Sequence, residues 1–237
     1  MMREIFDDVF SAAEAAASRI AADACEAVRA RGVFTFAVSG GETPWIMLRE
    51  LVRKDVPWQN VHIFQVDERV AADRHPDRNL THLRESLLNH VPLPADHVHP
   101  MPVTSTDLET AAASYARTLH RIAGSPAVLD LVHLGLGQDG HTASLVPEDP
   151  VLEITDRDVA LTGVYQGRYR MTLTCSVLSR ARKVLWVVTG KQKAEMLRRL
   201  CRGDRSIPAG HIDSGRALLI ADRAATGYPA AEQSMGA

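Results

Sequence analysis

The chain has 237 residues, of which 46% are hydrophobic and 24% are charged, and its formal net charge at pH 7 is -2. This balance is typical of a globular protein, and we expect a single domain over residues 1–237, with an ordered core of about residues 10–225 and a frayed tail from Ala230. The slight negative charge, with Lys and Arg spread along the chain, excludes a typical nucleic-acid-binding protein, and no apolar run is long enough to span a membrane.

The start of the chain and its cysteines indicate a compartment. The segment MMREIFDD carries acids where a signal peptide has bases, and no apolar segment follows it. Cys25, Cys175 and Cys201 are odd in number and widely spaced, which fits free thiols in a reducing compartment better than a disulfide framework. We therefore expect a cytoplasmic protein.

Helical and strand-like patterns alternate from one end of the chain to the other. Runs rich in β-branched residues predict strands, and apolar residues at helical spacing predict helices. The alternation predicts an α/β fold, with a doubly wound, mostly parallel sheet covered by helices on both faces in a Rossmann-like, three-layer arrangement. The predicted helices cover residues 10–31, 45–53, 79–90, 106–123 and 191–201, and the predicted strands cover residues 33–38, 61–66, 97–99, 128–134, 159–164, 169–174, 183–188 and 217–220.

Capping signals mark several helix ends. Ser11 with Glu14, and Thr106 with Glu109, have the spacing of capping boxes at helix starts. Gly32 is a typical helix stop.

A glycine turn joins the strand at 33–38 to the helix at 45–53. Its sequence is SGGETP, with Thr43 predicted as the N-cap and Pro44 as the first helical residue. Backbone N–H groups and the helix dipole favour an anion at such a junction, and the hydroxyls of Ser39 and Thr43 add donors. We expect this loop to bind phosphate. The alternative is a plain turn that uses glycine only for its shape.

The stretch LGLGQDGHTASLVP, residues 134–147, follows the strand at 128–134. Open α/β sheets place their chemistry outside the carboxyl ends of the strands, and glycines let the backbone approach a ligand. His141 is the side chain in this stretch that accepts a proton near neutral pH without a large pKa shift. The alternative is a tight turn in which Asp139 and His141 satisfy only local backbone groups.

Three further groups of polar residues bear on the site. Asp67-Glu68-Arg69 follows the strand at 61–66, and Asp67 either pairs with Arg69 or holds substrate hydroxyls. His97 and His99 lie on one face of a predicted strand, but no third ligand has a recognised spacing, so we predict no metal. A lysine is unfavourable at a helix N-terminus, so either Lys191 or Lys193 faces an anion, or both are solvated.

The order and spacing of five motifs resemble the 6-phosphogluconolactonase family. These motifs are SGGETP at 39–44, DER at 67–69, LGLGQDGHTASLVP at 134–147, RMTLT at 170–174 and VVTGKQKAEML at 187–197. The resemblance covers about residues 10–225, and DGHTASL is its most specific part. It implies a doubly wound α/β fold and hydrolysis of 6-phospho-D-glucono-1,5-lactone to 6-phospho-D-gluconate, the second step of the oxidative pentose phosphate pathway. It implies no cofactor and no metal.

The resemblance and the motifs together give a candidate site. The resemblance implies that His141 is the general base and that Arg170 and Lys193 contact the ligand, with Arg69 as a further candidate. Asp139, or another acid, fixes the tautomer of His141. The expected partner is a small phosphosugar lactone, with no nucleic acid and no membrane, and the protein is expected to be a monomer or small homo-oligomer. The predicted substrate-binding residues are Ser39, Gly40, Gly41, Thr43, Asp67, Arg69, Gly137, Arg170 and Lys193.

Other functions stay open at this point. Glucosamine-6-phosphate deaminase shares several of these motifs but has a Glu where this chain has Val146, which favours the lactonase. A non-catalytic phosphosugar sensor is another alternative, and Ser144 is a rival nucleophile that lacks the G-x-S-x-G context. Two segments depart from the lactonase pattern: Arg78 precedes Asn79 where the family often has Ser, and Gln166–Tyr169 replaces prolines.

Overall fold

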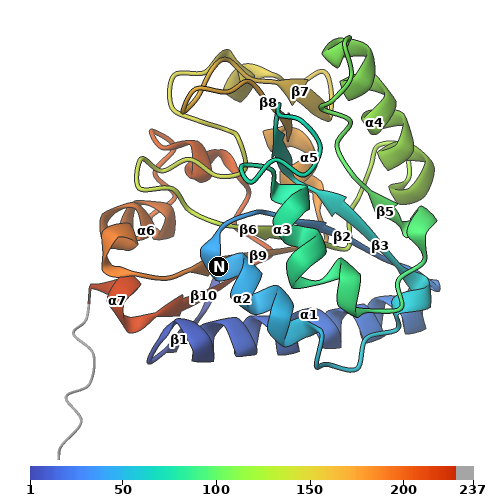
Figure 1. Ribbon diagram of the computed structural model, residues 1–237. Helices are drawn as coiled ribbons and strands as arrows, with labels where there is room; N and C mark the ends of the chain where they lie inside the picture. The colour runs from blue at the N-terminus through green and yellow to red at the C-terminus, as the bar shows by residue number, and fades with distance from the viewer. Residues whose placement is uncertain (228–237) are drawn as a thin grey trace, which may run out of the picture.

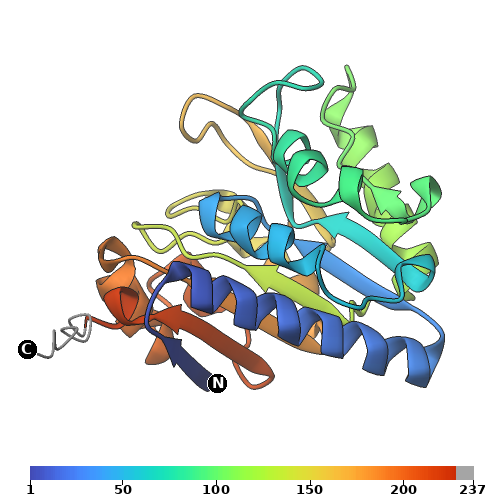
Figure 2. The ribbon, with the colours of Figure 1, turned by 60° about the horizontal axis from the view of Figure 1, so that its bottom comes forward.

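A seven-stranded sheet forms the centre of the protein, and the computed structural model describes residues 1–227. The strand order is β1-β10-β9-β6-β2-β3-β5, and every pair is parallel (Figure 2). This confirms the predicted doubly wound, mostly parallel sheet. The strands are β1 (Met2–Phe6), β2 (Phe34–Val38), β3 (Val61–Gln65), β5 (Val98–His99), β6 (Leu131–Leu134), β9 (Lys183–Val188) and β10 (Ala217–Asp222).

Helices cover both faces of the sheet and bury two separate apolar cores (Figure 1). One core lies under α1 (Val9–Arg31), α2 (Glu42–Leu51) and α3 (Asn79–Ser86). The other lies under α4 (Leu108–Ala123), α5 (Cys175–Arg180), α6 (Ala194–Cys201) and α7 (Arg223–Thr226). Consecutive strand residues point to opposite faces, so Phe36 packs into the first core while its neighbour Ala37 packs into the second. This two-sided burial explains the almost uninterrupted apolar runs of the central strands.

A second, antiparallel sheet stands apart from the large one, in the order β4-β8-β7. It contains β4 (Asp67–Arg69), β7 (Val159–Leu161) and β8 (Arg170–Leu173). Asp67–Arg69 follows β3, as predicted, but forms a strand of its own, which was not predicted. The chain leaves the large sheet after β3, and β4 pairs with β8, which lies about a hundred residues further along the chain.

Several predicted element ends shift in the structure. Asp8 and Asp107, not Ser11 and Thr106, cap α1 and α4, since their carboxylates accept hydrogen bonds from backbone N–H groups of the first turn. Gly32 ends α1 in a left-handed conformation, as predicted. In α2 the N-cap is Gly41, so Thr43 and Pro44 lie inside the first turn.

Strand β1, helix α5 and helix α7 were not predicted. Strand β1 pairs with β10, so the sheet begins before position 10, where we expected the ordered core to start. Helix α5 follows β8 directly and was missed because it is only one and a half turns long. The expected frayed tail from Ala230 lies outside the described residues. Within residues 1–227, no helix combines the length and apolarity needed to cross a membrane.

The strand order reverses direction between β2 and β6, which are neighbours in the sheet. From β2 the chain adds β3 and β5 on one side, whereas β6, β9 and β10 extend the sheet on the other. The loops after β2 and β6 therefore diverge at a topological switch point, where open α/β sheets bind ligands. These loops carry the SGGETP and GQDGHT motifs.

Candidate functional site

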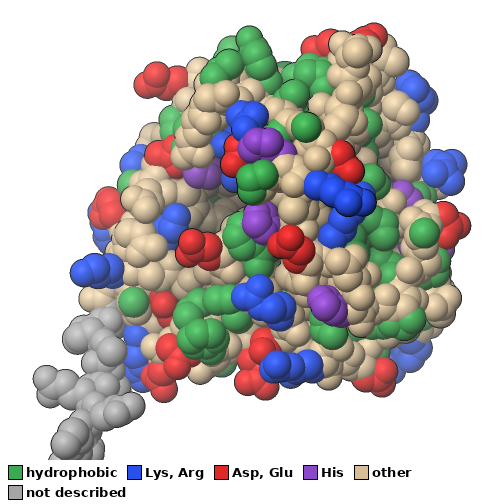
Figure 3. All heavy atoms as spheres, viewed as in Figure 1, with side chains coloured by type: hydrophobic (Ala, Val, Ile, Leu, Met, Phe, Trp, Pro, Cys, Tyr) green, Lys and Arg blue, Asp and Glu red, His purple; other side chains and the backbone are tan. Residues whose placement is uncertain are grey.

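A cleft of about 650 Å³ opens at the carboxyl edge of the sheet. Figure 3 shows this hollowed face, with His, Lys and Arg side chains at its rim. Loops after β2, β6 and β9 form one side of the cleft, and the small antiparallel sheet contributes Asp67, Arg69 and Arg170. The structure brings the predicted residues together, since the cleft is lined by Ser39, Gly40, Gly41, Thr43, Asp67, Arg69, Gly137, His141, Arg170 and Lys193.

Asp139 does not line the cleft but contacts His141 directly. Nδ1 of His141 lies 2.6 Å from Oδ1 of Asp139, and the backbone N–H of His141 donates to the same oxygen. Because an ionised carboxylate only accepts hydrogen bonds, this contact places the proton on Nδ1 and leaves Nε2 as a proton acceptor. Burial acts to raise the pKa of Asp139, but His141 and neighbouring donors outweigh it and hold the pKa below its usual value.

Gly137 makes this close pairing possible. A Cβ atom at position 137 would overlap Nδ1 of His141 and would lie 2.5 Å from Oδ1 of Asp139. The peptide N–H of Gly137 also donates to the carbonyl of His141 at 2.7 Å, which closes the loop tightly. The glycine-dense motif therefore shapes a loop in which Asp139 and His141 face each other.

The loop after β2 presents backbone N–H groups to the cleft. The N–H of Trp45 is the first in α2 to bond back, to the carbonyl of Gly41, so the N–H groups of Glu42 and Thr43 have no acceptor within the helix. Gly41 adopts φ 128°, a conformation that side chains rarely allow. The Ser39 hydroxyl, expected to serve a ligand, instead donates to the carbonyl of His133 at 3.0 Å.

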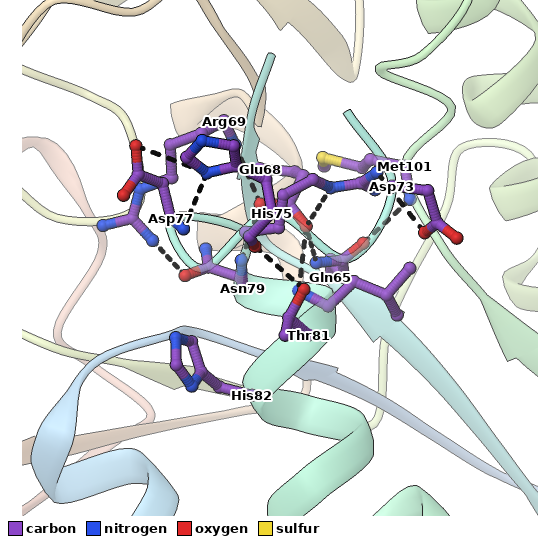
Figure 4. Close-up of polar contacts among 12 residues, drawn as sticks. Gln65, Glu68, Arg69, Asp73, His75, Asp77, Asn79, Thr81, His82 and Met101 are labelled. Carbon is purple, nitrogen blue, oxygen red and sulfur yellow. Dashed lines mark hydrogen bonds and ion pairs between the residues drawn. The ribbon is translucent and has the colours of Figure 1, made fainter. Parts of the chain in front are cut away.

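Asn79 connects the β2 loop to the small sheet, and sequence reasoning missed it. Its amide donates to the Asp67 carboxylate at 3.2 Å, and its oxygen accepts from Arg69. A Cβ atom on Gly40 would overlap that oxygen. Figure 4 shows Asn79 between Arg69 and the start of α3.

The remaining Asp67 oxygen accepts a hydrogen bond from the Ser144 hydroxyl at 2.6 Å, so Ser144 is a buried structural donor and not an exposed nucleophile.

Glu68, between the two cleft residues of the DER motif, has a different role. It is fully buried, and its carboxylate accepts from the N–H groups of Asn79 and Leu80 at 2.7 and 2.9 Å, which caps the start of α3 (Figure 4). Arg78, which departs from the lactonase pattern, is also buried, and its Nε lies 3.3 Å from Glu68. Arg78 therefore pairs with a buried acid and does not line the cleft.

Three cations, Arg69, Arg170 and Lys193, line the cleft together with three acids, Glu42, Asp67 and Asp222. Arg170 is buried, and burial together with the charge of Arg69 lowers its pKa. Its Nε makes no hydrogen bond within residues 1–227. Burial also lowers the pKa of Lys193, an effect that the negative charge of Asp139 partly offsets. Lys193 forms no ion pair in the described part of the chain, so its ammonium group is available to an anion in the cleft.

His97 and His99, with the neighbouring His62, do not form a metal site. His99 Nε2 lies 3.0 Å from His62 Nδ1, and the rings of His97 and His62 stack. Within residues 1–227, no group of three or more His, Cys, Asp or Glu side chains is arranged to hold a metal ion. The absence of a metal and of a cofactor from the chemistry stays a prediction.

Two more residues were missed by the sequence analysis. Asp222 lines the cleft at the end of β10 and accepts from the N–H of Gly190 at 2.9 Å, which positions the loop before Lys193. An acid at the carboxyl end of a strand was the signal, as for Asp67. Tyr165 contacts Asp139 from the β7–β8 turn, and no pattern in the sequence indicated that contact.

Comparisons with known proteins place this fold and site in a family. The family model described as Glucosamine-6-phosphate isomerases/6-phosphogluconolactonase matches residues 7–220. A 6-phosphogluconolactonase of Synechocystis sp. is 39% identical over 176 residues, 73% of each chain. The 6-phosphogluconolactonase of Mycobacterium tuberculosis is 36% identical over 234 residues, covering 93% of this chain and 95% of that protein.

The fold is also similar to that of a solved structure with the same name as these relatives. The crystal structure of a 6-phosphogluconolactonase from Shewanella baltica superimposes with a TM-score of 0.82 and 27% identity, and the match covers 94% of this chain and 97% of that one. The residues that the family model matches contain both glycine loops and the cations of the cleft, whereas β1 lies before them. The chain therefore belongs to the glucosamine-6-phosphate isomerase/6-phosphogluconolactonase family.

Proposed function

We propose that this chain is a 6-phosphogluconolactonase, which hydrolyses 6-phospho-D-glucono-1,5-lactone to 6-phospho-D-gluconate. Its relatives at 34 to 39% identity over most of the chain carry that name. One observation in the structure carries the chemistry. His141 faces a cation-lined cleft with its Nδ1 fixed by Asp139, so Nε2 is left to accept a proton.

The lactone is an activated ester, so the reaction needs a water molecule and a base. Nε2 of His141 takes a proton from water as the water oxygen forms its bond to C1 of the lactone. The bond between C1 and the ring oxygen then breaks, and the protonated imidazole returns the proton to the leaving oxygen. Asp139 stabilises the transient imidazolium and keeps the ring in one orientation.

The phosphate of the substrate binds away from the reacting carbon. Free N–H groups at the start of α2, together with Lys193 and Arg170, supply the positive potential that an anion needs. Arg69 lies beside Arg170 and adds to this potential. Binding energy from the phosphate holds C1 against the attacking water, which lowers the entropy cost of the reaction.

The deaminase alternative meets an obstacle at Val146. The deaminases that this chain resembles have a Glu at the matching position, whereas Val146 is buried and carries no titratable group. A sensor without activity would gain nothing from a histidine held in one tautomer by a carboxylate. The hydrolase is therefore the better account of the site.

The first test follows lactone disappearance by NMR, starting from freshly generated 6-phosphogluconolactone. Wild type, His141→Ala and buffer alone are compared, because the lactone also opens spontaneously. We expect the His141→Ala variant to lose about a hundredfold or more of the catalysed rate. His90→Ala is the matched control, since His90 is exposed and lies outside the cleft. If wild type does not exceed the buffer rate, the proposal is wrong, and an ammonia-release assay then tests the deaminase.

The remaining assignments stand as proposals beside this one. They are a single phosphosugar-lactonase domain over residues 1–237, a cytoplasmic location, a monomer or small homo-oligomer, and no nucleic-acid partner. The domain, the location and the absence of a nucleic-acid partner rest on the composition and motifs of the chain.

A further inference from the structure

The β7–β8 hairpin reaches over the candidate active site and contacts it through Tyr165. The Tyr165 hydroxyl donates to Oδ2 of Asp139 at 2.8 Å, while Oδ1 of Asp139 faces Nδ1 of His141 at 2.6 Å. Each carboxylate oxygen therefore has its own side-chain partner. The Tyr165 ring also meets the His141 ring edge to face, with 5.4 Å between their centroids.

Tyr165 is held in place on its other side by the substrate-binding wall. The guanidinium carbon of Arg170 lies 4.9 Å from the centre of the Tyr165 ring, a cation–π arrangement. Arg170 also donates to the Gln166 side chain at 3.1 Å. One tyrosine thus touches the proposed base, its carboxylate and a cation of the cleft.

The backbone around Tyr165 is a tight hairpin turn. Tyr165 and Arg168 exchange two backbone hydrogen bonds of 3.0 and 3.3 Å, and Gln166 and Gly167 between them have φ values of 51° and 77°. Positive φ at both central residues is the signature of the type I′ turn, which matches the twist of a two-stranded hairpin. The segment where this chain departs from the lactonase pattern therefore has a defined shape.

An ion pair anchors this turn to the loop between β4 and α3. Nε of Arg168 donates to Oδ2 of Asp77 at 2.6 Å. The backbone N–H of Val70 also donates to the carbonyl of Tyr169 at 2.9 Å. These two contacts hold the C-terminal side of the turn, and on its other side the N–H of Gly163 donates to Oδ2 of Asp149 at 2.8 Å. The position of the Tyr165 hydroxyl is therefore set by the fold and not by Asp139 alone.

We propose that Tyr165 is a positioning residue that orients Asp139 and, through it, tunes the basicity of His141. This inference rests on the proposed role of His141 as the base. A carboxylate with one free oxygen can rotate, whereas Asp139 is bonded through both oxygens and stays in the plane that His141 needs. The hydroxyl also shares the negative charge of Asp139, which weakens its pull on the His141 proton.

Removing the hydroxyl should therefore have two linked effects. Asp139 gains freedom, which lowers kcat, and its undivided charge stabilises the imidazolium form of His141. The other charged groups at this pair are Arg170 of β8 and Lys193 at the start of α6, and neither changes in the variant. Tyr165→Phe should thus shift the acidic limb of the pH–rate profile upward.

The experiment compares wild type, Tyr165→Phe and Tyr169→Phe. Tyr169 is the matched control, because it lies in the same hairpin, is 57% exposed and directs no side-chain hydrogen bond to the described residues. For Tyr165→Phe we expect kcat to fall about fivefold with little change in KM, and the acidic limb to rise by roughly half a pH unit. NMR titration of the His141 ring should show the same upward shift without any substrate.

The possible outcomes separate this inference from the proposed function. If wild type accelerates lactone opening and His141→Ala does not, but Tyr165→Phe matches wild type in kcat and in the His141 titration, Tyr165 has no positioning role. A lower kcat with an unmoved His141 titration would also overturn the inference, because loss of packing alone would explain it. If wild type is inactive, the proposed function fails, and the NMR titration still decides whether Tyr165 tunes His141.

Discussion

Arg69 and Arg170 sit directly opposite each other on the paired strands β4 and β8, so two guanidinium groups share one wall of the cleft. Like charges in register are unfavourable unless an anion lies between or beside them. Burial and the charge of Arg69 lower the pKa of Arg170, which is the electrostatic cost of this pairing. We therefore propose that an anion binds beside these two side chains.

This pairing predicts anion-dependent stability. At about a hundred times its Kd, 6-phosphogluconate should add about 2.7 kcal/mol to the free energy of unfolding and raise Tm by several degrees. The variants Arg69→Gln and Arg170→Gln should lose most of this gain. The control variant Arg74→Gln, which changes an exposed arginine in a loop, should keep it. Thermal scans with gluconate, which lacks the phosphate, provide the ligand control. Equal stabilisation by both ligands would count against a phosphate site.

Two lysines of one short turn offer a second test. Lys193 lines the cleft and is half-buried, while Lys191 is exposed and lies outside it. A hydrogen bond to a charged group contributes about 1.5–3 kcal/mol, so Lys193→Met should raise KM for the lactone by about tenfold or more and change kcat less. Lys191→Met should leave both constants near wild type. Steady-state kinetics that give the two variants the same KM would remove Lys193 from the binding site.

Neighbouring glycines in the loop after β6 provide a matched steric pair. A Cβ atom on Gly137 would collide with His141 and Asp139, whereas one on Gly135 meets nothing within 4 Å. Gly137→Ala should therefore lower kcat about as much as loss of His141, by about a hundredfold, and Gly135→Ala should stay close to wild type. Circular dichroism checks that both variants fold. An active Gly137→Ala enzyme would mean that the contact between Asp139 and His141 is dispensable.

Buried histidines predict how stability changes with pH. Burial and the nearby His62 lower the pKa of His99 to about 4, and burial lowers that of His133 to about 3. Because the unfolded chain takes up these protons near pH 6.5, stability is full above that pH and is lost as pH falls toward the folded-state values. As the pH falls from about 7 to about 4.5, uptake of this proton by His99 in the unfolded chain should lower the free energy of unfolding by roughly 2 kcal/mol.

Urea unfolding at these two pH values measures the loss. The variant His99→Gln should flatten the dependence, because glutamine takes up no proton in either state. His90→Gln changes an exposed histidine and serves as the control. A pH dependence that is identical in wild type and His99→Gln would show that His99 does not become protonated on unfolding.

Much of this architecture follows from local patterns. The runs that became β2, β6 and β9 are apolar on both faces and end in glycine, which identifies buried parallel strands and the loops at their carboxyl ends. Parallel strands bring those ends to one edge, so the sequence alone could place Gly41, His141 and Lys193 near one another.

The small sheet could not be predicted in the same way. Whether Asp67, Glu68 or Arg69 faces the cleft depends on which strand pairs with β4 and in which register, because side chains alternate along a strand. That partner, β8, is distant in sequence. The contact of Tyr165 with Asp139 is likewise long-range, and it depends on a turn whose two positive φ values are set by the hairpin as a whole.

The hairpin that carries Tyr165 also has a tip that can be changed without touching either apolar core. Its tip, Gln166 and Gly167, is exposed, and its stems belong to β7 and β8 rather than to the seven-stranded sheet. Insertions or exchanges at the tip would therefore leave the two apolar cores intact while altering what stands above His141. A library confined to Gly163, Val164, Gln166 and Gly167, with Tyr165 and Arg168 kept, should yield folded proteins with altered selectivity among sugar lactones.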